Sequence, residues 1–317
     1  MSAAWTHRHL IDVDILTADE LTLVLDLARS MSASRAAGTT EPVLHHQTMA
    51  TVFAEASTRT RTSFQLAARA LGGDVVSIEA ATSSLSKGES IIDTVRTLDA
   101  LGVGVIAIRH PDDGAARVAT DHFRGHVVNA GDGSHAHPTQ ALLDLYTLTE
   151  HLGADGIRGS KICIVGDLVH SRVARSGIWA LTTMGMDVWV TGPREFLAGF
   201  ETWAAELPAG RRLTITDDLG AGMRGAAAVM ALRVQRERLH GSAAPTEAGY
   251  AVAWGITEAR LVAACPDAIV MHPGPVNVGV ELPDDVASGP RSVITCQVAN
   301  GVPVRMAVLA LLAGTDA

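Results

Sequence analysis

The chain has 317 residues, of which 47% are hydrophobic and 19% are charged, and its formal net charge is −9. This length suggests two domains of ordinary size, and this composition excludes a largely disordered chain. The acidic balance argues against a nucleic-acid-binding surface, which would need a basic face. Local arginine clusters can still bind small anionic ligands.

Three cysteines, Cys163, Cys265 and Cys296, are far apart and form no C-x-x-C pair. They are expected to be reduced, buried thiols, so neither a disulfide framework nor a zinc site is predicted. The first residues show no signal-peptide pattern, and no stretch approaches the roughly 20 apolar residues of a membrane span. A soluble, cytoplasmic protein that binds neither membranes nor nucleic acid is therefore expected.

The first half of the chain alternates between strand and helix patterns. Thr17 and Glu20 form a capping-box pattern before an amphipathic helix over residues 17–37. A buried strand over residues 51–53 leads to Ser57 or Thr58, either of which can cap the helix that follows. Further strands are expected over residues 74–78, 104–108 and 127–129, and further helices over residues 91–101, 114–120 and 141–152.

The second half repeats this alternation. Strands are expected over residues 161–167, 187–190, 213–216, 227–231 and 268–271, and helices over residues 173–184 and 300–312. Strand–helix alternation through both halves predicts an α/β fold of two doubly wound parallel-sheet domains. The break between the domains is expected near the helix over residues 141–152.

Residues 57–61, Ser-Thr-Arg-Thr-Arg, stand between a buried strand and the start of a helix. Two hydroxyls, two arginines and the free N–H groups of a first helical turn together form a phosphate-binding site. The alternative is a capped surface helix whose arginines are only solvated. The position directly after a buried strand favours the anion site.

Other polar clusters also follow predicted strands, where ligands bind in open parallel sheets. These clusters are Arg109, residues 137–140, Arg172, residues 233–235 and residues 272–275. Each has a structural alternative: Arg109 could cap a strand end, His137 could be a turn residue, Gln140 could cap a helix, and Arg172 and Arg233 could form interdomain salt bridges. Together they indicate a site that binds anions and polarises a carbonyl.

The residue patterns of nucleophilic catalysis, metal binding and dinucleotide binding are not found in this sequence. No Ser/His/Asp nucleophile arrangement is visible, and His135-x-His137 has no nearby carboxylate or cysteine partner to complete a metal site. Gly166-Asp167 follows a strand, but the G-x-G-x-x-G dinucleotide pattern is absent. We therefore expect no metal and no cofactor.

Three motifs together resemble the aspartate/ornithine carbamoyltransferases: S-T-R-T-R at 57–61, H-P-T-Q at 137–140 and R-V-Q at 233–235. The resemblance runs from Arg8 to Arg305, nearly the whole chain. It implies a carbamoyl-phosphate-binding domain over residues 1–140, with a C-terminal helix over 293–317 packing back on it. Residues 141–292 would form the amino-acid-binding domain, with the active site in the cleft between the two domains.

The resemblance implies transfer of the carbamoyl group of carbamoyl phosphate to the amino group of L-aspartate. The products would be N-carbamoyl-L-aspartate and phosphate, in pyrimidine biosynthesis. The R-V-Q motif and the H-P-G-P segment at 272–275 favour aspartate. Two departures leave the acceptor open: Ala54 stands where relatives commonly carry an aromatic residue, and Val278 where many carry arginine. The alternatives are ornithine or another amine as acceptor, or a non-catalytic scaffold partner of another pyrimidine enzyme.

The same resemblance assigns roles to individual residues. The catalytic residues would be Arg59, Thr60, Lys87, Arg109 and His137, and among these Thr60, Arg109 and His137 would point at the carbonyl oxygen. Carbamoyl phosphate would contact those five and also Ser57, Thr58, Ser83, Gln140, Pro273 and Gly274. Aspartate would contact Lys87, Arg172, Arg233 and Gln235.

The resemblance also implies partners. Ser83 and Lys87 match a mobile loop that reaches the active site of a neighbouring subunit, so a homotrimer with shared active sites is expected. Glu55 matches a residue that pairs with Arg172 and Arg238 when the domains close. A regulatory chain or dihydroorotase is a possible further partner.

Overall fold

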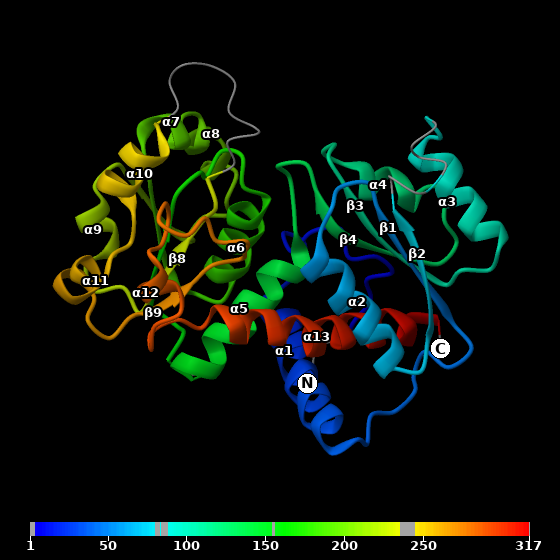
Figure 1. Cartoon of the computed structure of the whole chain (residues 1–317). Helices are drawn as coiled ribbons and strands as arrows, with labels where there is room; N and C mark the ends of the chain where they lie inside the picture. Colours follow the sequence, from blue (N-terminus) through cyan, green and yellow to red (C-terminus); the bar gives the residue numbers. More distant parts are fainter. Residues whose placement is uncertain (1–3, 80–82, 84–87, 154–155, 235–244, 317) are drawn as a thin grey trace. The chain divides into compact units, whose positions relative to one another are not determined.

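The computed structural model describes residues 4–79, 83, 88–153, 156–234 and 245–316 of the chain (Figure 1). The chain forms two compact units, one of Met1–Tyr146 with Val298–Ala317 and one of Thr147–Gln297. Each unit contains a parallel sheet with alternating helices, so the predicted fold class is confirmed.

The first unit is built on a four-stranded parallel sheet in the order β2-β1-β3-β4. The inner faces of its strands bury Ala50, Val52, Ile106, Ile108 and Val127 in one apolar core. Strands β1, β3 and β4 are buried over most of their length and therefore read as nearly continuous apolar runs in the sequence, whereas β2 is largely exposed. The elements of this unit, apart from helices α5 and α13, are α1 (Ala18–Ala37), β1 (Thr48–Phe53), α2 (Thr58–Ala70), β2 (Asp74–Glu79), α3 (Ile91–Ala100), β3 (Val105–His110), α4 (Ala115–Thr120) and β4 (His126–Asp132).

The second unit is built on a five-stranded parallel sheet in the order β7-β6-β5-β8-β9. Its core includes Cys163, Val165, Val229, Ala231 and Val270. The elements are β5 (Lys161–Val165), α6 (Arg172–Thr183), β6 (Asp187–Thr191), α7 (Arg194–Leu197), α8 (Phe200–Ala204), β7 (Arg212–Thr216), α9 (Leu219–Met223), β8 (Ala228–Ala231), α10 (Glu247–Trp254), α11 (Glu258–Ala264), β9 (Ile269–Met271) and α12 (Asp284–Ala287).

Predicted helix starts are confirmed where a side-chain cap fixes them. Thr17 and Glu20 form the reciprocal capping box at the start of α1. Ser57, one of the two candidates, is the N-cap of α2, and its side chain accepts a hydrogen bond from Thr60 N. In both helices, the hydroxyl satisfies an N–H group that has no partner within the helix.

Helix α5 (Pro138–Leu152) begins three residues before the predicted start at 141. Proline suits the first helical position, because its fixed φ fits a helix and its missing N–H is not needed there. The His-Pro-Thr-Gln motif is therefore not a loop in front of a helix. Pro138, Thr139 and Gln140 are its first turn.

Helix α13 (Ile294–Ala313) begins six residues before the predicted start at 300 and contains Pro303. It is long and apolar enough to cross a membrane by length and composition, so the expectation that no such stretch exists was wrong. However, 67% of its most apolar window is buried inside the protein, as in the core helix of a soluble domain. Beside α2, the Arg305 guanidinium of α13 lies 4.9 Å from the centre of the Phe64 ring (Figure 1).

Two smaller expectations also need correction. Strands β3 and β4 run beyond the predicted 104–108 and 127–129, because they continue to pair as far as His110 and Asp132. Cys163 and Cys265 are buried, but Cys296 is exposed. Cys296 lies in the first turn of α13, on a face that its neighbours leave open to solvent.

Candidate functional site

The carboxyl ends of β1, β3 and β4 lie side by side in the first sheet. Phe53 at the end of β1 is in register with Arg109, and Ala54 N donates to Arg109 O at 2.8 Å. His110 is in register with Asp132 at the end of β4. This edge therefore brings together the polar segments that follow the three strands, as the sequence predicted.

The start of helix α2 has the features of an anion site. Ser57 Oγ accepts a hydrogen bond from Thr60 N at 3.3 Å, which fixes the first turn. Thr58 and Arg59 are exposed and Thr60 is buried. The partial positive charge of a helix N-terminus favours an anion at this position, and Arg59 can add a charge-assisted hydrogen bond.

Arg109 forms an ion pair at the same edge of the sheet. Its Nη2 lies 2.6 Å from Glu55 Oε1, and the Arg109 side chain is only 12% exposed. Its Nη1 also donates to Ala130 O at 3.4 Å. The predicted pairing of Glu55 with Arg172 and Arg238 on domain closure stays a prediction, and Arg238 lies outside the described residues.

His137 directly precedes α5, and Gln140 lies in its first turn. Both side chains are buried, and Gln140 N donates to His137 O at 3.0 Å. Gln140 Nε2 donates to Asp144 Oδ1 at 2.9 Å, one turn further along the helix. The first turn of α5 thus holds Gln140, and its hydrogen bond to His137 O ties the residue before the helix to that turn.

Asp132 is a buried carboxylate that the sequence analysis missed. It accepts hydrogen bonds from Gly114 N and Asn129 Nδ2, each at 2.7 Å, and from Ala136 N at 3.1 Å. Burial acts to raise the pKa of Asp132, but hydrogen bonds from His135 and Asn129 outweigh it and the pKa is lowered. Asp132 therefore fixes the turn that leads to His137.

In the second unit the carboxyl ends of β5, β8 and β9 are also adjacent. Arg172 is the first residue of α6, after the N-cap Ser171, and its side chain is buried. Arg233 follows β8 and is half-buried, while Pro273 and Gly274 follow β9. Within this unit, the predicted residues therefore share one edge of the sheet.

Glu281 is a second buried carboxylate that the sequence analysis missed. Its Oε1 accepts from Val234 N at 2.7 Å, and its Oε2 accepts from Asn277 N at 2.8 Å. Burial raises the pKa of Glu281, against the effect of these hydrogen bonds. Glu281 therefore ties the segment that carries Arg233 to the loop that follows Pro273 and Gly274.

The remaining predicted residues are only partly described. Lys87 and Gln235 lie outside the described residues, and Ser83 is half-buried between two undescribed stretches. The catalytic and binding roles assigned to all of these side chains stay predictions.

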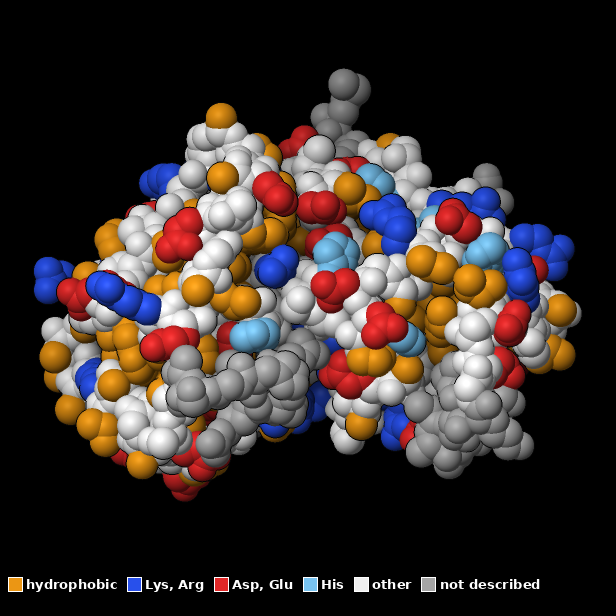
Figure 2. Space-filling model, turned by 90° about the horizontal axis from the view of Figure 1, so that it is seen from above, with side chains coloured by type: hydrophobic (Ala, Val, Ile, Leu, Met, Phe, Trp, Pro, Cys, Tyr) orange, Lys and Arg blue, Asp and Glu red, His pale blue; other side chains and the backbone are white. Residues whose placement is uncertain are grey.

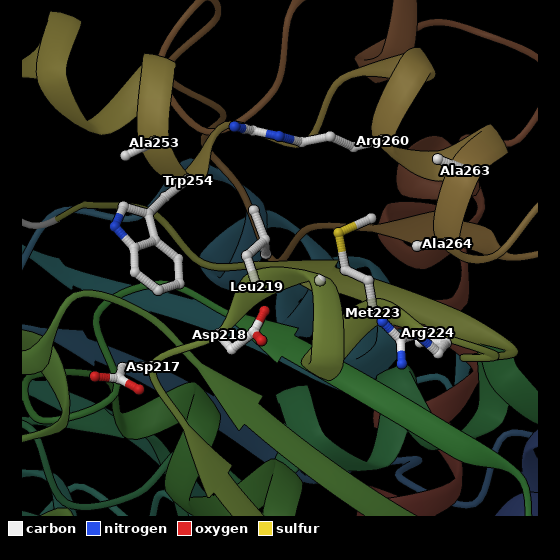
Figure 3. Close-up of a pocket in the computed structure, with 11 residues that line it drawn as sticks. Asp217, Asp218, Leu219, Met223, Arg224, Ala253, Trp254, Arg260, Ala263 and Ala264 are labelled. Atoms are coloured by element: carbon white, nitrogen blue, oxygen red, sulfur yellow. The ribbon is translucent and has the colours of Figure 1, made fainter.

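A pocket of about 630 Å³ lies elsewhere in the second unit, between helices α9, α10 and α11. Figure 3 shows the side chains of Leu219, Met223 and Trp254 around it. None of the described side chains that line it was predicted as a site residue. The pocket is therefore lined by other residues than those of the candidate site.

Figure 2 shows acidic, basic and histidine side chains mixed together on the face that it views. Such a surface does not present a field of one sign, in keeping with the modest net charge of −9. The positive charge of the candidate site is local: Arg109, Arg172 and Arg233 are buried or half-buried, and Arg59 is exposed at the start of α2. This arrangement suits small anions.

Two family profiles match the chain. The profile described as "Aspartate/ornithine carbamoyltransferase, carbamoyl-P binding domain" matches residues 8–150. The profile described as "Aspartate/ornithine carbamoyltransferase, Asp/Orn binding domain" matches residues 158–312. Together they cover nearly the whole chain.

Individual relatives agree with these matches. The chain is 46% identical over 308 residues to the aspartate carbamoyltransferase catalytic subunit of Roseiflexus sp. (strain RS-1), covering 97% of this chain and 95% of the relative. It is 48% identical over 316 residues to the same subunit of Sorangium cellulosum, covering 99% of this chain and 95% of the relative.

Solved structures give the same fold. The ornithine carbamoyltransferase of Pyrococcus furiosus has a TM-score of 0.85 at 29% identity and covers 99% of both chains. The aspartate transcarbamoylase of Trypanosoma cruzi, in complex with carbamoyl phosphate and aspartate, has a TM-score of 0.83 at 30% identity, covering 98% of this chain and 99% of that chain.

Proposed function

Because this chain belongs to the aspartate/ornithine carbamoyltransferase family, we propose that it transfers the carbamoyl group of carbamoyl phosphate to L-aspartate. The products are N-carbamoyl-L-aspartate and phosphate. The relatives at 46–48% identity are named for aspartate, which supports aspartate over ornithine as the acceptor. The observation that carries the proposal is the shared strand edge that holds the α2 N-terminus, Arg109 and the turn before His137.

Carbamoyl phosphate binds mainly to residues of the first unit in this proposal, with Pro273 and Gly274 added from the second. The start of α2, with Ser57, Thr58 and Arg59, holds the phosphate. Thr60, Arg109 and His137 stabilise the negative charge that develops on the carbonyl oxygen when an amine attacks the carbonyl carbon. The remaining contacts come from Gln140, from the carbonyls of Pro273 and Gly274, and from Ser83 and Lys87.

Aspartate binds through cationic and amide side chains. Arg172 and Arg233 suit its two carboxylates, because a guanidinium forms bidentate hydrogen bonds with a carboxylate. Gln235 and Lys87 complete this set. The leaving phosphate can accept the proton of the attacking amine, so the reaction requires no protein general base.

We also propose an oligomeric state, a pathway and a class of protein partner for this chain. The chain forms a homotrimer in this proposal. Ser83 and Lys87 then reach the active site of a neighbouring subunit, where Lys87 contacts both substrates. The reaction product suits pyrimidine biosynthesis in the cytoplasm. A regulatory chain or dihydroorotase is the class of protein partner that the family resemblance suggests.

The test is an assay of the purified chain with carbamoyl phosphate and a panel of amino acids that includes aspartate and ornithine. Ornithine belongs in the panel because Val278 is 59% exposed at a position where many relatives carry arginine. We expect ureido product with aspartate. Product with another amine alone would overturn the acceptor, and no product with any amine would overturn the proposed activity.

A further inference from the structure

A buried carboxylate lies one helical turn from Gln140 on α5. Gln140 Nε2 donates to Asp144 Oδ1 at 2.9 Å, and residues four apart share one face of a helix. The exposed fraction is 8% for Gln140 and 2% for Asp144. Water therefore competes little for this hydrogen bond.

This contact selects one orientation of the Gln140 amide. An ionised carboxylate can only accept hydrogen bonds, whereas an amide has a donor end and an acceptor end. Nε2 and Oε1 are bonded to the same carbon and point in different directions. With Nε2 directed at Asp144, Oε1 therefore points away from Asp144 and can accept a hydrogen bond from another group. In the described part of the chain no group donates a hydrogen bond to Gln140 Oε1.

The buried Arg305 guanidinium on α13 interacts electrostatically with Asp144. This guanidinium on α13 is fully buried, donates to Gly301 O at 3.0 Å and lies over the Phe64 ring. Burial lowers the pKa of Arg305 to about 9, and attraction to Asp144 acts in the opposite direction. Opposite charges that interact in this way each favour the charged form of the other.

We propose that Asp144 is a positioning residue that orients the Gln140 amide to accept a hydrogen bond from an N–H group of the ligand. The site then distinguishes a carbamoyl group from an acetyl group. The two groups differ by NH₂ against CH₃ and have nearly the same size, so shape alone separates them poorly. This inference rests on the proposed function, which places carbamoyl phosphate beside Gln140.

The test compares two stable ligands, phosphonoacetamide and 2-oxopropylphosphonate, which share the phosphonate and the carbonyl and differ by NH₂ against CH₃. Their dissociation constants are measured by titration calorimetry on the whole chain. We expect the original chain to prefer the amide by at least about tenfold. In Asp144→Asn, residue 144 can donate as well as accept, so Gln140 can turn over, and the preference should fall to within about threefold.

Three further variants make the result decisive. Asp99→Asn, which changes a surface ion pair with Arg124 in the same unit, should keep the preference. Asp144→Glu retains a carboxylate and should keep part of it. If Asp144→Asn does not fold, Asp144→Asn combined with Arg305→Met removes both buried charges and should show the same loss of preference.

An unchanged preference in the folded Asp144 variant, or an equal loss of affinity for both ligands, would overturn the inference. Both outcomes are read from binding alone. A failure of the proposed function appears separately, as an original chain that makes no ureido product in the turnover assay. The two failures are therefore distinguishable.

Discussion

Arg109 is a candidate residue whose position is restricted by an ion pair. Its side chain is mostly buried, its Nη2 lies 2.6 Å from Glu55 Oε1, and it stands near the end of the central strand β3. In the proposed reaction, a cation held in this way would stabilise charge on the carbonyl oxygen without moving. Its removal is therefore expected to lower the rate more than the stability of the fold.

We predict that Arg109→Ala lowers kcat by about 10²–10³-fold, which is typical of removing one donor to a developing oxyanion. The measurement is steady-state turnover with carbamoyl phosphate and aspartate, together with thermal unfolding to show that the variant is folded. The matched control is Arg124→Ala, which breaks a surface ion pair with Asp99 in the same unit and should retain turnover. Near-normal turnover of Arg109→Ala would contradict the assignment.

His135 gives the stability of the chain a pH dependence. Its hydrogen bond to Asp132 raises the pKa of His135 above the ordinary 6.5, and Asp12 and Asp113 add to the effect. A raised folded-state pKa gives stability that is fully present below about pH 6.5 and is lost as the pH rises through the higher, folded value. The pH range in which this stability is lost therefore lies above the ordinary histidine pKa.

We predict that His135→Gln weakens the dependence of the free energy of unfolding on pH above the ordinary histidine pKa. Urea unfolding at about pH 6 and about pH 8.5 should show a larger loss of stability with rising pH in the original chain than in the variant. His122→Gln is the matched control, because His122 is a half-buried histidine of the same unit that forms no ion pair within the described part of the chain. Equal pH dependence in the original chain and His135→Gln would show that the Asp132 contact does not affect stability.

The sequence indicated candidate ligand-binding side chains but not the side chains that hold their segments in place. Arg109 and Arg172 follow buried strands, so their positions come from the periodicity of apolar residues and the rule of strand ends. Asp132 and Glu281 accept hydrogen bonds from backbone N–H groups of other segments. The residue types of the sequence do not show that a carboxylate will accept from a backbone N–H group, because every non-proline residue has the same N–H group.

Among the elements, α2 combines a structural cap with a candidate ligand site. Ser57 and Ser90 are N-caps of the same kind, at the starts of α2 and α3. Removing a serine N-cap typically costs about 1 kcal/mol of stability. Only one of these two helix starts lies at the proposed phosphate site.

We predict that Ser57→Ala and Ser90→Ala lose similar stability, about 1 kcal/mol each, in urea unfolding. Only Ser57→Ala should also weaken the binding of carbamoyl phosphate, because its hydroxyl and the first turn of α2 contact the phosphate. Calorimetric titration of both variants measures this difference. Equal losses of affinity for carbamoyl phosphate in the two variants would show that the start of α2 contributes no more to the site than the start of α3 does.

Helix boundaries show what sequence patterns leave undetermined. The interior apolar residues of α5 and α13 were predicted, but both helices begin earlier than their periodicity indicated. The extra turns hold Gln140 in α5 and Gln297 in α13, whose partners are Asp144 and the backbone N–H of His272. Such polar first turns carry little apolar periodicity, so contacts with the rest of the protein decide where the helix starts.

At the scale of the whole molecule, the proposed homotrimer makes a complementation test possible. If Lys87 serves a neighbour's site, a trimer that mixes Lys87→Ala chains with Arg59→Ala chains contains some intact sites. Random mixing in equal amounts should restore roughly one quarter of the original activity, since a site then needs one chain of each kind in the right order. The measurement is turnover after denaturing and refolding the two variants together.

The control for this experiment mixes each variant with itself under the same conditions. Native mass spectrometry establishes that the mixed chains are present in common trimers. Activity that stays at the level of the separate variants, in a mixture shown to contain hybrids, would contradict a site shared between subunits.

Helix α13 has a consequence for how the protein is made. Residues 147–297 form the second unit as one continuous stretch, whereas the first unit needs residues 298–317 as well as residues 1–146. In α13 the side chains of Val304, Met306 and Leu309 are buried, and Arg305 lies over Phe64. On the ribosome, residues 147–297 are complete before the rest of α13 is synthesised, whereas the first unit gains its contacts with α13 only afterwards.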